Sequence, residues 1–325
     1  MKKILVTGGS GFIGTNLVDA LLKQGVGVLN LDSSKPPKAD HHAYWNGVDI
    51  LDYPSLERAI LEFNPEVIVH LAAVADLDGT TDEHYDANVK GTQNIIDISN
   101  KLSSLKKVIF TSSMYVCKPG YIPKNYDDYK AHTLYGQSKV KGELLVKSIK
   151  DSRYSWVIIR PSSIWGPWFK IPYIDFFNVV YQGKYFDFNN TCTKTYGYVE
   201  NTVFQILKLI DADNVHAKTF YLGDNPPTQI SEWANEISIE MGKGKIKKVP
   251  FFLVRMAALA GDLLYKANIK FPITSFRLSN MTTNNILPLN DLYTLIGPPP
   301  VSRLEGVRRT IGWLVEHKGF QVKQK

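Results

Sequence analysis

The sequence predicts an α/β fold in which helices cover both faces of a mostly parallel sheet. Two observations lead to this prediction. Short runs rich in β-branched residues alternate with longer segments of helical periodicity through the first half of the chain, and this alternation is typical of successive β–α–β units. The glycine-rich stretch 7–14 separates the first run from the first helical segment, as happens where a buried strand turns sharply into a helix.

Each element of the first half follows from this alternation. The expected strands are Lys3–Thr7, Val26–Asp32, Glu66–Leu71, Val108–Thr111 and Trp156–Arg160, and the expected helices are Phe12–Gln24, Pro54–Phe63, Asp82–Leu102 and His132–Lys150. Pro54 suits the first turn of a helix, because the backbone there needs no donor. We expect residues 1–165 to form a Rossmann-type, doubly wound parallel sheet.

After Arg160-Pro161 the pattern becomes irregular, and proline, glycine and aromatic residues are more frequent. Helices are expected at Tyr198–Ile210, Ile230–Met241, Phe251–Tyr265 and Arg303–His317, and a strand at Thr219–Leu222. We expect residues 166–325 to form mainly a smaller, mixed α/β substrate-binding lobe. A strand and a helix from about 195–222 are expected to join the first domain.

Composition restricts the function classes. The 325 residues carry a formal charge of +7 and two cysteines, Cys117 and Cys192, which cannot form a disulfide framework and do not have metal-ligand spacing. We therefore expect a reducing, cytoplasmic location and no metal site. The sequence contains no recognisable nucleic-acid-binding module.

Two segments leave alternatives open. The densest basic cluster, Lys243, Lys245, Lys247 and Lys248, is either a solvated surface or a field that attracts an anionic, diphosphate-bearing substrate. The most apolar stretch, Val249–Tyr265, is interrupted by polar residues and glycine, so we expect a packed helix and no stable membrane insertion. A helix lying on a membrane surface is the alternative.

The stretch Thr7–Gly14 indicates a dinucleotide site. Gly8, Gly11 and Gly14 allow a tight turn, a close approach to a pyrophosphate and close packing of helix on sheet. The apolar Phe12 and Ile13 open the helix, whose first N–H groups attract phosphates. Asp32 ends the second strand, where a carboxylate accepts hydrogen bonds from a ribose 2′-hydroxyl and repels a 2′-phosphate. The sequence therefore favours NAD over NADP.

Tyr135 and Lys139 are the candidate catalytic pair. Four residues apart on a helix, they share one face. A phenol titrates near pKa ~10, and a neighbouring ammonium is expected to lower that pKa toward working pH. The hydroxyls of Thr111, Ser112 and Ser113 stand at the carboxyl end of a strand, where ligands bind in such sheets. Which of the three acts stays open.

These motifs together resemble the extended short-chain dehydrogenase/reductase family, which contains UDP-galactose 4-epimerase and nucleotide-sugar reductases. The resemblance runs over most of the chain. It rests on Thr7–Gly14, Asp49-Ile50, His70-Leu71-Ala72-Ala73, Asn88–Thr92, Thr111–Tyr115, Tyr135 with Lys139, and Arg160–Pro167.

The resemblance also implies roles for single residues. Asp49 and Ile50 would hold the adenine. Leu71, Ala72 and Ala73 would line the cofactor cleft, Asn88 would support the site from its helix, and Ser162 would lie at the cofactor. Thr111 would take the active hydroxyl position, with Ser113 close to the substrate. Lys194 stands where many members have an arginine on the substrate diphosphate, and Ser163 where many epimerases have an asparagine.

Three hypotheses follow from the resemblance. The leading one is a nucleotide-sugar epimerase acting at C4 through transient hydride transfer to bound NAD. The second is a one-way NAD(P)-dependent reductase or dehydrogenase of a 4-keto nucleotide sugar or another alcohol, such as a sterol. The third is a non-catalytic dinucleotide sensor. Dehydration is not expected, because Ser112 and Ser113 stand where the related dehydratases have Asp-Glu. A homodimer through Asp82–Leu102 and His132–Lys150 is expected from the family.

Overall fold

A computed structural model describes residues 1–170, 173–188, 192–266 and 274–322 of the chain. The chain forms two compact units, each built from more than one segment. The first unit comprises Met1–Ile164, Val199–Gly223 and Pro288–Pro300, and the second comprises Trp165–Tyr198, Asp224–Leu287 and Val301–Lys325.

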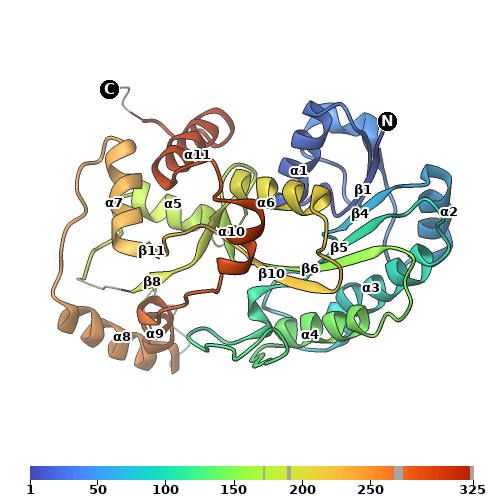
Figure 1. Cartoon of the computed structure of the whole chain (residues 1–325). Coiled ribbons are helices and arrows are strands. Elements are labelled where there is room, and N and C mark those ends of the chain that lie inside the picture. The colour runs from blue at the N-terminus through green and yellow to red at the C-terminus, as the bar shows by residue number, and fades with distance from the viewer. Residues whose placement is uncertain (171–172, 189–191, 267–273, 323–325) are drawn as a thin grey trace. The chain divides into compact units, whose positions relative to one another are not determined.

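A seven-stranded sheet forms the centre of the first unit (Figure 1). Its strand order is β10-β6-β5-β4-β1-β2-β3, and all paired neighbours are parallel. The chain moves outward from β1 in one direction as far as β3 and then crosses back to β4 on the other side of β1. Ligands bind at such a reversal, beyond the carboxyl ends of the strands. The strands are β1 (Lys3–Thr7), β2 (Gly27–Leu31), β3 (Trp45–Asn46), β4 (Val67–His70), β5 (Lys107–Thr111), β6 (Ser155–Pro161) and β10 (Lys218–Leu222).

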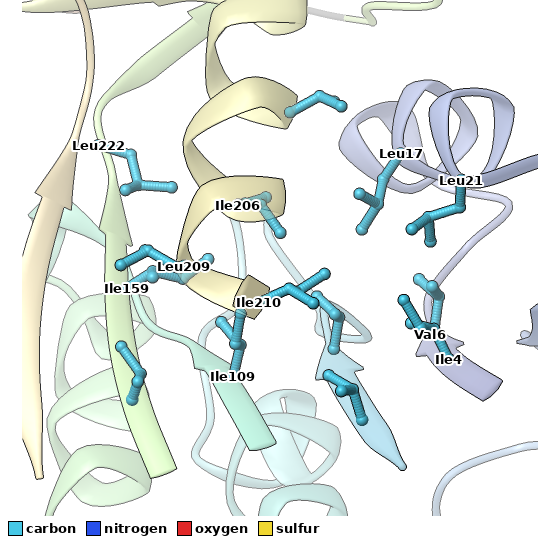
Figure 2. Close-up of a cluster of buried hydrophobic side chains, with 14 of the residues drawn as sticks. Ile4, Val6, Leu17, Leu21, Ile109, Ile159, Ile206, Leu209, Ile210 and Leu222 are labelled. Carbon is cyan, nitrogen blue, oxygen red and sulfur yellow. The ribbon is translucent and has the colours of Figure 1, made fainter. Parts of the chain in front are cut away.

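Helices cover both faces of this sheet. Alternate strand residues point to opposite faces, so Ile4 and Val6 of β1 pack in one cluster and Leu5 packs in the other. The first cluster receives α1 (Phe12–Lys23), α6 (Val199–Asp211) and α10 (Asn290–Ile296). Figure 2 shows Leu17 and Leu21 of α1 and Ile206 and Ile210 of α6 over the strands. The second cluster receives α2 (Tyr53–Phe63), α3 (Asp86–Ser99) and α4 (Leu134–Lys147).

The second unit is mostly helical. Its helices are α5 (Tyr173–Tyr181), α7 (Ile230–Glu240), α8 (Phe251–Lys266), α9 (Ser275–Thr282) and α11 (Arg303–Lys318). β8 (Thr193–Lys194) pairs antiparallel with β11 (Thr228–Gln229). The short strand β9 (Tyr196–Tyr198) also belongs to this unit, whereas strand β7 (Ser163–Trp165) begins in the first unit and ends with Trp165 in the second. A cluster of aromatic rings, with Trp165, Tyr198 and Trp233 at its centre, fills the interior.

The predicted fold class, a doubly wound parallel sheet, is confirmed. The expected helix Asp82–Leu102 is shorter than predicted: a 3₁₀ turn, η2 (Glu83–Tyr85), precedes α3, which ends at Ser99. The stretch Pro288–Pro300, with α10, also joins the first unit, although no sequence motif marks it. Within the described ranges, no helix is both long and apolar enough to cross a lipid bilayer.

Candidate active site

The glycine turn between β1 and α1 leaves no room for larger residues. Gly8 has a φ of +71°, and a Cβ there would lie 2.6 Å from the backbone nitrogen of Ala72. A Cβ on Gly14 would lie 2.1 Å from the carbonyl oxygen of Gly8. Gly11 is the N-cap of α1 and provides no side-chain cap. The turn therefore brings exposed backbone to the start of α1, which is the arrangement that a pyrophosphate needs.

Asp32 directly follows β2 and is tied to this turn. Its carboxylate accepts hydrogen bonds from the backbone nitrogen of Ser10 at 3.0 Å and of Ser34 at 2.8 Å. Each carboxylate oxygen has a second lone pair for a ribose hydroxyl. Asp49 is exposed and accepts from the backbone nitrogen of Leu51 at 2.9 Å, whereas Ile50 is buried beside α3.

The loop after β4 is held at both ends. Leu71 and Ala72 donate their backbone N–H groups to the carbonyl and hydroxyl oxygens of Thr7, at 3.0 and 3.3 Å. Further along the loop, the Asn88 side chain accepts from the backbone nitrogen of Val74 at 2.8 Å and donates to Ser138 Oγ at 2.9 Å. Asn88 thus joins the loop that contains Ala73 to helix α4.

Helix α4 presents Tyr135 and Lys139 together at the end of β5. The Thr133 hydroxyl caps the helix by accepting from the backbone nitrogen of Gly136 at 3.0 Å. Lys139 is buried, and its ammonium donates to the carbonyl oxygen of Thr111 at 3.0 Å. The Ser113 hydroxyl lies beside the Tyr135 phenol and lowers its pKa. A phenol, a hydroxyl and an ammonium therefore meet at the carboxyl edge of the sheet.

Burial controls the protonation of this pair. It raises the pKa of Tyr135 to about 12, and the Ser113 hydrogen bond opposes this rise in part. It lowers the pKa of Lys139 to about 8, against the attraction of the Glu143 carboxylate. The expected lowering of the Tyr135 pKa by Lys139 is not seen in the protein by itself: burial of the phenol raises that pKa, and Ser113, not Lys139, is the group that opposes the rise.

The three hydroxyls at the end of β5 differ in their surroundings. Of these, Ser113 contacts Tyr135. Within the described part of the chain, Thr111 Oγ1 and Ser112 Oγ are buried with no hydrogen-bond partner, as is Ser162 Oγ after β6. The resemblance implies that Thr111 takes the active position, and this role stays a prediction, although Ser113 is the hydroxyl beside the Tyr135 phenol. Ser162 and Ser163 belong to the first unit and Lys194 to the second, in β8.

Sequence reasoning missed the groups that surround the catalytic pair. The rings of Tyr85 and Tyr115 lie 6.0 and 6.1 Å from the ring of Tyr135. Glu143 lies one turn after Lys139 and accepts hydrogen bonds from Arg160 at 2.7 Å on each oxygen. The four-residue spacing of Lys139 and Glu143 was the available signal, since such residues share a helix face.

These residues fit a dinucleotide. A Cβ on Gly8 or Gly14 would collide with the backbone, Asp32 has acceptor capacity left, and buried hydroxyls without a partner among the described residues stand at the strand ends. NAD would rest its pyrophosphate on the start of α1 and its adenosine ribose on Asp32, with its nicotinamide end toward Tyr135 and Lys139.

Comparison with known proteins agrees with this assignment. Residues 4–223 match the NAD dependent epimerase/dehydratase family. The chain is 28% identical to UDP-glucose 4-epimerase of Vibrio cholerae, over 95% of this chain and 94% of that protein. It is also 28% identical to the decarboxylating sterol-4-alpha-carboxylate 3-dehydrogenase of Saccharomyces cerevisiae, over 97% and 99%. Among solved structures, UDP-glucose 4-epimerase of Thermotoga maritima has the same fold, with a TM-score of 0.75, 22% identity, and coverage of 97% and 99%. The chain belongs to the NAD-dependent epimerase/dehydratase family and is an NAD-dependent enzyme.

Proposed function

We propose that this enzyme is a nucleotide-sugar 4-epimerase. The observation that carries the proposal is the buried Tyr135, beside Ser113 and one helical turn from Lys139, at the sheet edge where we expect the nicotinamide end of NAD. The likeness to UDP-glucose 4-epimerase of Vibrio cholerae, which spans nearly the whole of both chains, supports the same reaction.

The chain's own residues move the proton. When bound, NAD would supply the hydride acceptor and, in its oxidised form, a positive charge. Because a nearby positive charge lowers the pKa of a phenol, ionisation of Tyr135 is coupled to cofactor binding. Tyr135 takes the proton of the sugar C4 hydroxyl and returns it at the end of the cycle. Ser113 orients the C4 oxygen, and the Lys139 ammonium holds the ribose.

The proposal extends to three residues that would recognise the substrate. We propose that Ser113 and Ser163 contact the sugar and that Lys194 of β8 binds the diphosphate. A Lys194→Met variant should raise KM with little change in kcat, since uniform binding is lost and the reacting groups are untouched. A fall in kcat with KM unchanged would exclude this role for Lys194.

The direct test is incubation with NAD and a panel of UDP-, GDP- and dTDP-sugars, followed by proton NMR of the anomeric signals. One sugar should convert to its C4 epimer with no net change in absorbance at 340 nm. Tyr135→Phe should lower the rate about 100- to 10,000-fold. If Tyr135→Phe preserved every activity, the chain would act as a dinucleotide sensor.

A net dehydrogenase or reductase is the second candidate. The likeness to the sterol-4-alpha-carboxylate 3-dehydrogenase of Saccharomyces cerevisiae favours it, since 97% of this chain aligns. Ser163 stands where many epimerases have an asparagine, which also favours a dehydrogenase or reductase. Steady change at 340 nm with a 4-keto sugar nucleotide or a sterol would select this candidate, because an epimerase leaves NAD unchanged.

Assembly and location complete the proposal. We propose a homodimer through α3 and α4 in the cytoplasm. Sedimentation velocity at micromolar concentration should give a dimer. A monomer at that concentration would exclude the dimer and leave the proposed chemistry intact.

A further inference from the structure

Helix α8 (Phe251–Lys266) of the second unit has two apolar faces, and the unit buries one of them. Ala258 packs with Phe188 and Leu278 in a small core cluster, against which Val254 also packs. Polar contacts hold the same helix: the Asp262 carboxylate accepts from the backbone nitrogen of Ser275 at 3.0 Å. Figure 1 shows α8 beside α9. The orientation of α8 within its unit is therefore fixed by packing.

The other face is exposed and apolar. Phe252, Met256, Leu259 and Leu263 have exposed fractions of 61, 63, 55 and 69%. Their spacing of four, three and four residues places them in one row along a helix of 3.6 residues per turn. We call this row the α8 stripe. The inward residues Val254, Ala258 and Gly261 follow the same spacing about half a turn away.

The α8 stripe differs from ordinary surface apolar residues. Isolated exposed apolar side chains, such as Ile122 and Leu144, are normal on a folded protein. Here Phe251 and Leu253 widen the row, so six exposed large apolar side chains lie between Phe251 and Leu263. A contiguous patch of this kind marks a surface that meets a protein partner or a membrane.

Positive charge precedes the α8 stripe and occurs once within the helix. Four exposed lysines, Lys243, Lys245, Lys247 and Lys248, precede the helix, and Arg255 is exposed within it. No aspartate or glutamate occurs between Glu240 and Asp262. The lysine segment is anchored to the unit, because Lys247 O accepts from the backbone nitrogen of Asp187 at 3.0 Å.

We propose that α8 docks this protein on an anionic lipid bilayer, with the α8 stripe at the headgroup–acyl boundary and the basic residues on the lipid headgroups. An exposed apolar helix face flanked by lysine and arginine is typical of interfacial helices. At 16 residues, α8 is about 24 Å long and lies in the plane of the surface. A second copy of the chain fits less well, because it would present the same positive charges.

Vesicle co-sedimentation of the full chain tests the proposal. Binding to vesicles of phosphatidylcholine with about a third phosphatidylglycerol should exceed binding to phosphatidylcholine alone by about tenfold or more, and should fall in 0.5 M salt. Met256→Gln/Leu263→Gln should weaken binding by a similar factor. Ile122→Gln is the matched control, since Ile122 is 83% exposed in the other unit. Circular dichroism verifies that both variants fold.

Charge and apolar contributions can be separated. Lys245→Glu/Lys247→Glu/Lys248→Glu should abolish the preference for anionic vesicles. The control is a triple reversal at three exposed lysines of the other unit, 124, 150 and 218. If the control reversal removed the preference equally, net charge alone would explain binding and the proposal would be overturned.

A fluorescent label locates the contact. Cys117 and Cys192 are buried, so a nitrobenzoxadiazole label can be directed to Leu259→Cys. Its emission should shift to the blue with anionic vesicles, whereas a label at Ile122→Cys should not respond. Unchanged emission at position 259, or vesicle binding unaffected by the stripe variant, would overturn the proposal. So would self-association without vesicles that Met256→Gln/Leu263→Gln abolishes. None of these outcomes bears on the proposed epimerase reaction.

Discussion

Removing the Arg160 side chain should destabilise the first unit severely. Arg160 has no exposed surface, and its partner Glu143 is 2% exposed. The guanidinium donates to both Glu143 oxygens at 2.7 Å, to the Tyr126 carbonyl at 2.6 Å and to the Tyr221 hydroxyl at 3.0 Å. In Arg160→Met, the buried carboxylate keeps the Tyr129 hydroxyl at 2.8 Å and, as its remaining ion-pair partner, the more distant Lys147 ammonium at 3.7 Å. A buried charge left in this way costs about 3–5 kcal/mol.

The double variant provides the internal control. Replacing both members of a buried ion pair with apolar residues of similar size is often nearly neutral. In Arg160→Met/Glu143→Leu, the Tyr126 carbonyl still loses its donor, which costs about 1–3 kcal/mol. The double variant should therefore be more stable than Arg160→Met alone, although it carries one more substitution.

Urea unfolding followed by circular dichroism gives the free energy of unfolding of the wild type, Arg160→Met, Glu143→Leu and the double variant. These four values form a double-mutant cycle, which isolates the coupling between the two side chains. The reasoning fails if Arg160→Met lies within about 1 kcal/mol of the wild type. It also fails if the double variant loses the sum of the two single losses, because the pair would then have no coupling.

Three predictions concern the active site. Gly14→Ala should weaken NAD binding by about tenfold or more, or about 1.4 kcal/mol, because its Cβ would lie 2.1 Å from the Gly8 carbonyl oxygen. In the control Gly312→Ala, the new Cβ would have no described atom within 4 Å, so calorimetry should give the wild-type affinity. Equal affinities would contradict this. Burial lowers the pKa of Lys139 to about 8, so its ammonium is present below that pH. NAD affinity should therefore fall as the pH rises through that value, whereas the affinity of Lys139→Met should not vary over the same range. A wild-type affinity that did not change with pH would refute the role of Lys139 in binding NAD. Ser113→Ala should lower turnover roughly 100-fold and Thr111→Val only slightly, and the reverse order in steady-state rates would return the active position to Thr111.

The sheet and its large helices could be predicted because their signals are local. Strands such as Val67–His70 are buried on both sides and form continuous apolar runs. Two-residue strands such as Trp45–Asn46, and helix α10 with 7 residues, have too few positions for a recognisable period. They form because neighbouring elements provide partners: β3 pairs with β2, and Leu292 of α10 enters the main core.

The candidate site, too, could be predicted from the sequence only in part. The spacing of Tyr135 and Lys139 is a property of one helix, and the sequence reveals it directly. Whether Thr111 or Ser113 meets Tyr135 depends on how the chain turns after β5, where the 3₁₀ turn η3 (Met114–Val116) begins with Ser113 as its cap. The pKa of Tyr135 depends on burial by residues distant in sequence, such as Tyr85. Neither property is visible in a linear motif.

The division of the first unit into three separate stretches affects how the protein can be synthesised and cut. Edge strand β10 pairs with β6, whose residues precede it by about 60 positions, as in Val157 with Lys218. α10 arrives later still, between 290 and 296. When only residues up to 165 have emerged from the ribosome, β6 is an unprotected sheet edge that can pair with other chains. Translation must therefore pass residue 300 before this unit can close, and a protease cut between the stretches should leave fragments that stay associated.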